Sequence, residues 1–199
     1  MAPQTEYREA KGALRTEHRA LRRQIAPAIA AEAALRAAQH LATHRLWSAS
    51  QHVGLFLAND GELDPAPIAA NARQAGKTLY LPSIQGQSLE FRRWDADTPL
   101  HPNRYGIGES AGAPQAGSDL DLLVIPLVAW SPSGARLGMG GGFYDRFIAA
   151  LPDQRPFLLG LAYSSQQDER IDAMRESWDA PLDGVLTEEG LTLCNSEAS

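Results

Sequence analysis

The chain has 199 residues, of which 44% are hydrophobic and 21% charged, and these proportions exclude a disordered or fibrous protein and indicate one folded domain. The formal net charge of −6 argues against nucleic acid as a partner. A single cysteine, Cys194, excludes an internal disulfide, and the absence of a signal-like start or of the roughly 18–20 apolar residues of a membrane span predicts a cytoplasmic protein with no membrane partner.

The first expected element is a helix over residues 5–25, in which Leu14, Leu21 and Ile25 recur at helical spacing. Basic residues gather on this helix, where the only acidic residues between positions 8 and 23 are Glu9 and Glu17. The basic residues are Arg8, Lys11, Arg15, Arg19, Arg22 and Arg23. We expect most of them on a solvated face, and Lys11 and Arg15 lie one helical turn apart on one side of the helix.

Helices and strands then alternate along the chain. A second helix begins at Pro27, which suits a first helical turn, and runs to about residue 45. The expected strands cover residues 52–58, 78–81, 88–94, 120–128, 157–162 and 183–187, with helices over residues 65–75 and 143–151. The most apolar strand, 120–128, is expected at the centre of the sheet. This order predicts an α/β fold, a three-layer αβα sandwich with a mostly parallel central sheet and N-terminal helices.

The segment 95–118 is rich in proline, glycine and polar residues. It is too long for an ordinary connection in a compact domain, and loops of this length usually have a function. We interpret it as part of the wall of a site.

A glycine cluster separates the central strand from the helix that follows it. Its members are Gly138, Gly140, Gly141 and Gly142. Glycine permits positive φ angles and lets backbone amides surround an anion, here at the end of a strand, where open α/β sheets bind ligands. The cluster is neither a Walker A loop nor a dinucleotide fingerprint, and a flexible turn is the alternative. Arg136 before it, and Tyr144 and Asp145 after it, favour phosphoryl transfer, which needs a phosphate-binding Arg and a carboxylate for Mg²⁺.

Two other interpretations of the residues stay open. Sugar-phosphate isomerases and acyl-transfer enzymes with α/β folds also place glycine loops at strand ends, and a fold does not fix a function. The basic N-terminal helix is also compatible with a binding module that docks on RNA or on an acidic protein.

The stretch from Val124 to Asp145, V-I-P-L-V-A-W-S-P-S-G-A-R-L-G-M-G-G-G-F-Y-D, resembles the 5-formyltetrahydrofolate cyclo-ligases, also called methenyltetrahydrofolate synthetases. Four further features of that family recur in order over nearly the whole chain. They are K-x-x-x-R at Lys11 and Arg15, an acidic residue after the first strand at Glu62, Y-G-I at Tyr105–Ile107, and P-x-D-x-V-x-T-E at Pro181–Glu188. The resemblance implies a single cyclo-ligase domain over residues 1–199.

The resemblance also implies a reaction and its residues. ATP would phosphorylate the formyl oxygen of 5-formyltetrahydrofolate, nitrogen 10 would attack the activated carbon, and 5,10-methenyltetrahydrofolate, ADP and phosphate would result, with Mg²⁺ as cofactor and a monomer as the expected state. ATP would be held by Lys11, Arg15, Arg136, Leu137, Gly138, Met139, Gly140, Gly141, Gly142, Phe143 and Tyr144. Glu62 and Tyr105 would contact the folate, and Asp145 and Asp183 would hold Mg²⁺.

One departure from the family pattern concerns catalysis. Some relatives have Lys or Arg among the variable positions of the glycine loop, where this chain has Met139 and Gly141. Arg136 or Lys11 is therefore expected to be the catalytic cation that meets the transferred phosphate.

Overall fold

The computed structural model describes residues 4–176 and 178–194 and contains an eight-stranded sheet with the order β12-β11-β10-β7-β1-β2-β3-β6. The strands are β1 (His52–Gly54), β2 (Thr78–Gln85), β3 (Ser88–Arg93), β6 (Pro114–Gln115), β7 (Leu122–Pro126), β10 (Phe157–Leu161), β11 (Gly184–Thr187) and β12 (Gly190–Leu193). From β2 to β11 all neighbours are parallel, and the three strands at the edges are antiparallel. The expected mostly parallel sheet, with residues 120–128 at its centre, is confirmed.

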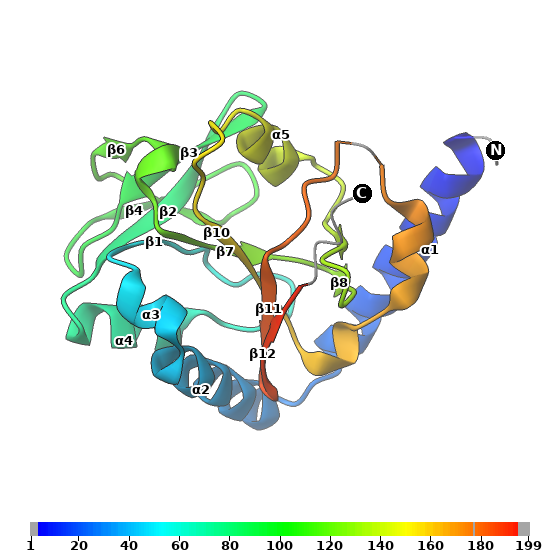
Figure 1. Ribbon diagram of the computed structural model, residues 1–199, viewed down its shortest axis with the longest axis horizontal. Helices are drawn as coiled ribbons and strands as arrows, with labels where there is room; N and C mark the ends of the chain where they lie inside the picture. Colours follow the sequence, from blue (N-terminus) through cyan, green and yellow to red (C-terminus); the bar gives the residue numbers. More distant parts are fainter. Residues whose placement is uncertain (1–3, 177, 195–199) are drawn as a thin grey trace.

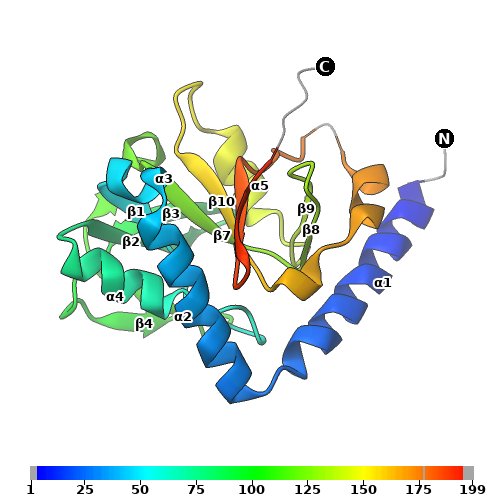
Figure 2. The ribbon, with the colours of Figure 1, turned by 60° about the horizontal axis from the view of Figure 1, so that its bottom comes forward.

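Helices cover both faces of this sheet (Figures 1 and 2). On one face lie α2 (Pro27–Thr43), α3 (Arg45–Ala49) and α4 (Ala66–Gln74), and on the other lies α5 (Phe143–Ala149). Successive strand residues point to opposite faces. Leu122 and Val124 of β7 pack with the α2 side, while Leu123 and Ile125 pack with Phe147 of α5. The three-layer arrangement is therefore as expected.

The N-terminal helix α1 (Gln4–Arg23) lies on neither face. Both ribbon views place it at one end of the molecule, beside β8 (Ala129–Trp130), β9 (Arg136–Leu137) and the 3₁₀ helix η3 (Glu169–Met174). Leu14 of α1 joins a small apolar cluster with Leu137 and Ile171. His18 Nε2 lies 2.8 Å from Asp168 Oδ2, in the segment that follows β10. The basic helix thus crosses the edge at which the parallel strands end.

The structure differs from the expected elements where strands are short. The first strand ends at Gly54 rather than at residue 58. The segment 95–118 contains the hairpin β4 (Leu100–Pro102) and β5 (Gly108–Ser110), which Glu109 fastens to β2 by accepting hydrogen bonds from Ser83 Oγ at 2.7 Å and Ile84 N at 3.0 Å. The β8–β9 hairpin and β12 were not expected, because strands of two to four residues show no periodicity.

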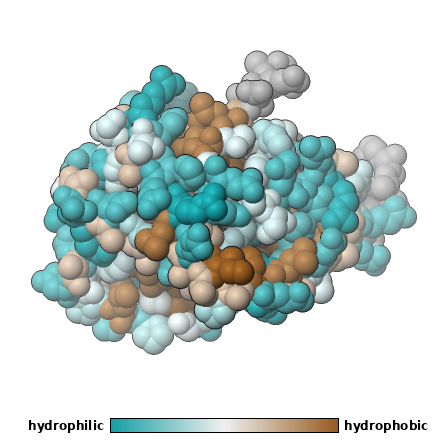
Figure 3. All heavy atoms as spheres, turned by 90° about the horizontal axis from the view of Figure 1, so that it is seen from below, coloured by the Kyte–Doolittle hydropathy of each residue, from teal (hydrophilic) through white to brown (hydrophobic). Residues whose placement is uncertain are grey.

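The surface on the α2 side is mainly hydrophilic, with small apolar groups between polar side chains (Figure 3). Ile29 and Leu35 are the large hydrophobic residues of α2 that are exposed, whereas Ala33, Ala34, Ala37 and Ala38 turn into the core. Among the described residues no helix combines the length and apolarity that crossing a membrane requires.

Candidate functional site

The glycine loop, residues 136–145, folds against α1. Gly140 and Gly142 have φ angles of +93° and +64°, a region that side chains strongly disfavour. Arg15 Nε donates a hydrogen bond to Gly138 O at 2.7 Å, and a side chain at Gly140 would lie 3.4 Å from the Arg15 guanidinium carbon. The backbone therefore needs glycine at these turns, and the loop and the basic helix form one unit.

Two predicted phosphate-binding cations are held by carboxylates. Arg136 is buried, with a side chain 6% exposed; it donates to Ala180 O and pairs with Asp145. Burial lowers the pKa of Arg136, and the charge of Asp145 partly offsets that effect. Lys11 Nζ lies 2.7 Å from a carboxylate oxygen of Glu176. The pairing neutralises both cations and keeps them in place beside the glycine loop.

The other residues of the glycine loop have different surroundings. Leu137 is 4% exposed and packs in the cluster below α1, so its side chain contributes to the core. Met139 is half exposed, with its sulfur 4.0 Å from Arg22 Nη2. The ring centroid of Phe143 lies 5.4 Å from the guanidinium carbon of Arg146. Arg146 Nη2 donates a hydrogen bond to Gly141 O at 2.7 Å.

Tyr105 lies beside this loop although it is distant in sequence. Its ring meets that of Phe143 edge-on, with centroids 6.5 Å apart, and Arg104 stacks on both rings. The side chain of Tyr105 is 55% exposed. Part of the segment 95–118 thus borders the glycine loop, a position that suits a site wall.

Glu62 lies in the loop after β1, and Tyr144 lies at the end of the glycine loop, in the first turn of α5. The side chain of Glu62 is 12% exposed, and its Oε2 accepts a hydrogen bond from Asn59 N at 3.0 Å. Burial raises the pKa of Glu62, while the Asn59 amide and Arg22 act in the opposite direction. Burial likewise raises the pKa of Tyr144, and the Glu62 charge raises it further. The Tyr144 hydroxyl is buried with no hydrogen-bond partner in the described chain, so a ligand group would complete its bonding.

The two aspartates predicted to bind a metal have different environments. Asp145 is 36% exposed and shares one oxygen with Arg136 beside the glycine loop. Asp183 precedes β11, and its two oxygens accept hydrogen bonds from Arg155 at 2.6 and 2.9 Å and from Leu158 N at 2.7 Å. It therefore lies near the starts of the parallel strands, opposite the edge that α1 crosses. Among the described residues, no group of three His, Cys, Asp or Glu side chains is suited to a metal ion.

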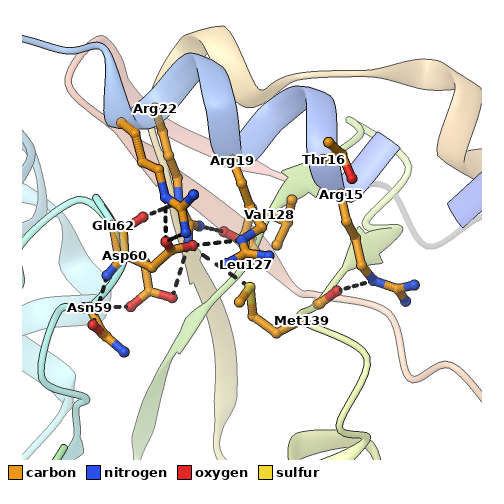
Figure 4. A network of polar contacts seen from close by, with 12 residues as sticks. Arg15, Thr16, Arg19, Arg22, Asn59, Asp60, Glu62, Leu127, Val128 and Met139 are labelled. Carbon is orange, nitrogen blue, oxygen red and sulfur yellow. Dashed lines mark hydrogen bonds and ion pairs between the residues drawn. The ribbon is translucent and has the colours of Figure 1, made fainter. Parts of the chain in front are cut away.

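Arg22 was expected on a solvated face, and that expectation is wrong. Its side chain has no exposed area, whereas those of Arg19 and Arg23 are 34% and 53% exposed. All three bind the carboxylate of Asp60 (Figure 4). Arg22 follows Arg15 by seven residues, two helical turns, so helical spacing alone could have placed it on the same face. These cations are engaged within the chain, which weakens the case for docking on RNA.

Comparisons with known proteins show which family this chain is similar to. The model of the 5-formyltetrahydrofolate cyclo-ligase family matches residues 7–188. The 5-formyltetrahydrofolate cyclo-ligase of Haemophilus influenzae is 33% identical over 87% of this chain and 95% of its own, and that of Escherichia coli K12 is 35% identical over 83% and 93%. The NMR structure of Aquifex aeolicus 5,10-methenyltetrahydrofolate synthetase is 27% identical, covers 95% of both chains and superposes with a TM-score of 0.83.

Proposed function

This chain belongs to the 5-formyltetrahydrofolate cyclo-ligase family, and we propose that it uses ATP and Mg²⁺ to convert 5-formyltetrahydrofolate to 5,10-methenyltetrahydrofolate. Membership makes it an enzyme and a ligase. The nucleotide, the metal and the residues that serve them are the parts that the proposal adds.

The observation that carries the proposal is the double contact of the glycine loop. On one side Arg15 binds Gly138 O. On the other side Met139 Sδ lies 4.0 Å from Arg22 Nη2, which is 3.6 Å from Oε1 of Glu62, the predicted folate residue. A phosphate donor on the glycine loop and an acceptor beside Glu62 would therefore be neighbours, as direct phosphoryl transfer requires.

The proposed chemistry has two steps. The formyl oxygen on nitrogen 5 attacks the γ-phosphorus of ATP, and ADP leaves with the electron pair of the broken P–O bond. Nitrogen 10 then attacks the activated carbon and loses its proton, and phosphate departs with the former formyl oxygen. Phosphorylation is needed because an amide oxygen is otherwise a poor leaving group, and positioned cations stabilise the charge on the transferred group.

The cations would exchange their present partners for phosphate oxygens. Lys11 would leave Glu176, and Arg136 would share or leave Asp145. Met139 and Gly141 bring no charge to the loop, so Arg136 and Lys11 are the proposed catalytic cations. Arginine suits this role because its guanidinium binds two phosphate oxygens at once.

Mg²⁺ would be held by Asp145 together with phosphate oxygens. Protein Mg²⁺ sites of this kind use one or two carboxylates and substrate phosphates, so a single accessible carboxylate beside the glycine loop fits the ion. When bound, the ion would neutralise charge on the phosphates. Asp183 is a second metal ligand only by resemblance, because its oxygens are engaged by Arg155 and Leu158.

An absorbance assay tests the proposal. Purified protein is mixed with 5-formyltetrahydrofolate, ATP and Mg²⁺, and the methenyl chromophore and released phosphate are measured together. We expect one phosphate per methenyl group formed, and no product when ATP is replaced by a non-hydrolysable analogue. Folded protein that forms no methenyl product from intact substrate would refute the proposed function.

A further inference from the structure

Arg22 carries a charge into the interior at the end of α1. Its Nε donates to Asp60 O at 2.8 Å, Nη1 to Leu127 O at 3.1 Å, and Nη2 to Asp60 Oδ2 at 3.0 Å. A buried guanidinium is tolerated only when hydrogen bonds and a counter-ion replace the water it has lost. Asp60 and the carbonyl at the end of β7 provide that replacement.

The same guanidinium lies between two parts of the site (Figure 4). Its Nη2 is 3.6 Å from Glu62 Oε1 and 4.0 Å from Met139 Sδ. Glu62 belongs to the loop after β1, and Met139 belongs to the glycine loop. Arg22 is therefore a direct bridge between the predicted folate residue and the predicted phosphate loop.

The turn that carries Asp60 is shaped by this contact. Asp60 has a φ angle of +55°, and Gly61 follows with +74°. A side chain at Gly61 would lie 3.3 Å from Arg22 O. A non-glycine residue in the left-handed region costs energy and persists where the surroundings impose it. The turn is thus held against α1. This contact fixes the position of the Glu62 backbone, which follows the turn directly.

We propose that Arg22 is a positioning residue for the reaction: with Asp60 as its counter-ion, it orients the Glu62 carboxylate, keeps it charged and holds it at a fixed distance from the glycine loop. Arg22 acts through Glu62 and Met139, since its own side chain has no exposed area. The ionisable groups near Glu62 are Arg22, Asp60 and Tyr144. Arg22 is the cation among them, so it favours the carboxylate form. The inference rests on the proposed function.

The kinetic test uses Arg22→Gln, which removes the charge. In the wild type, kcat/KM for the folate should fall at acidic pH as Glu62 is protonated. In the variant this acidic limb should move to higher pH by about one unit, because an opposite charge at this distance has been lost. At neutral pH, kcat should also fall at least tenfold. A limb at the wild-type position, or unchanged kcat, would overturn the proposal.

Arg23→Gln is the matched control. Arg23 is the next residue on α1 and binds the same Asp60, but it is half exposed and makes no contact with Glu62. In Arg23→Gln, the acidic limb of the pH profile of kcat/KM and the value of kcat should match those of the wild type. A shift as large as that of Arg22→Gln would mean that the Asp60 turn, and not the bridge to Glu62, sets the rate, and would overturn the proposal.

Arg22→Lys covers the case in which the glutamine variant does not fold. An ammonium keeps the charge but cannot bond Asp60, Leu127 and Glu62 together. The acidic limb should stay in place while kcat falls, and full wild-type kcat would overturn the positioning role.

The influence of Arg22 on Glu62 can be measured without the reaction, so it can be tested separately from the proposed function. The pKa of the Glu62 carboxyl is read without substrate, by ¹³C NMR titration of wild type and Arg22 variants, with Glu62→Gln for assignment. If wild-type protein forms no methenyl product, the proposed function falls, yet the titration still reports whether Arg22 governs Glu62. A Glu62 pKa that is the same with and without Arg22 overturns the inference alone.

Discussion

At the scale of single residues, the structure brings Arg136 and Asp145 into direct contact, although sequence reasoning gave them separate roles. Arg136→Ala should reduce kcat/KM about 100-fold or more, as expected for loss of one preorganised donor to the transferred phosphate. The chain should remain folded because the pairing of Arg136 with Trp130 in the β8–β9 hairpin is made by the backbone and does not depend on the side chain. Steady-state kinetics and circular dichroism check both statements, and a folded variant with normal turnover would contradict the assigned role.

Asp145→Asn tests the metal assignment separately. The Mg²⁺ concentration for half-maximal rate should rise about tenfold, as for loss of one ligand interaction. Asp183→Asn is the comparison: it breaks the pair with Arg155, so we expect lower thermal stability with an unchanged Mg²⁺ requirement. The reverse pattern would assign the metal to Asp183, the other of the two aspartates that the family resemblance implied as ligands.

Asp60 gives a pH-dependent prediction. Burial alone would raise its pKa, but hydrogen bonds from Arg19, Arg23 and Arg22 outweigh burial and lower it from 3.8 to about 2. Because the pKa of Asp60 is lower in the folded than in the unfolded state, the ionised carboxylate increases the free energy of unfolding above pH 4. This contribution is lost as the pH falls from 4 through 2. Asp60→Asn should therefore cost about 1–2 kcal/mol near neutral pH. Asparagine tolerates the positive φ angle, so the substitution removes the charge of Asp60 without adding backbone strain.

The comparison of wild type and Asp60→Asn is made by urea unfolding from pH 7 down to pH 2.5. The difference in unfolding free energy should shrink steadily below pH 4, because other depressed carboxylates, such as Asp168, occur in both proteins and cancel. A difference that does not depend on pH would show that Asp60 acts through something other than its charge.

At the scale of elements, two glycines of the glycine loop, Gly138 and Gly140, differ in how strictly the backbone requires glycine. Gly140 has a φ angle of +93° and faces Arg15, whereas Gly138 has an ordinary φ angle and would accept a side chain with nothing within 4 Å. Gly140→Ala should cost at least about 1–2 kcal/mol in loop conformation and raise KM for ATP about tenfold. Gly138→Ala should stay within about twofold of wild type. Equal effects of the two substitutions would mean that the backbone shape of the loop is unimportant.

Elements with a strong period were predictable from sequence, and those held by distant contacts were not. The spacing of Leu14 and Leu21 predicts the helix α1, and the apolar run of β7 predicts the central strand. The β8–β9 hairpin has strands of two residues each and depends on packing beneath α1. The first strand ends early, at Gly54. Local sequence contains no sign of such tertiary effects.

At the scale of the whole molecule, α1 connects parts of the site that the sheet alone would leave apart. Arg22 binds the loop after β1 and the end of β7, Arg15 binds the glycine loop, and His18 pairs with Asp168 after β10. Chain order did not reveal this convergence. The glycines alone predicted an anion site, and the contribution of Lys11 and Arg15 to it came from the family resemblance. Arg22 was missed because a basic helix normally faces solvent.

The modest apolar anchoring of α1 leads to a prediction about stability. From Glu6 to Arg23 of α1, Leu14 is the side chain buried in an apolar cluster, whereas α2 buries Ala33, Ala37 and Leu41 in the main core. Polar contacts with the site loops therefore contribute much of the attachment of α1. Segments with few apolar contacts open more readily than the core, and a ligand that binds the closed form slows that opening.

Hydrogen exchange with and without ATP and Mg²⁺ measures this effect. Amides of α1 from Gly12 to Arg22 and those of the glycine loop should exchange more slowly with nucleotide, because Lys11 and Arg15 would be bound to phosphate. Amides of α2 should be unaffected, since α2 lies on the face of the sheet opposite to α5, the helix that follows the glycine loop. Arg15→Ala should abolish the protection of α1, because it removes both the phosphate contact and the bond to Gly138 O. Protection spread equally over α1 and α2 would instead indicate general stabilisation, and would argue against a nucleotide site formed by the N-terminal helix.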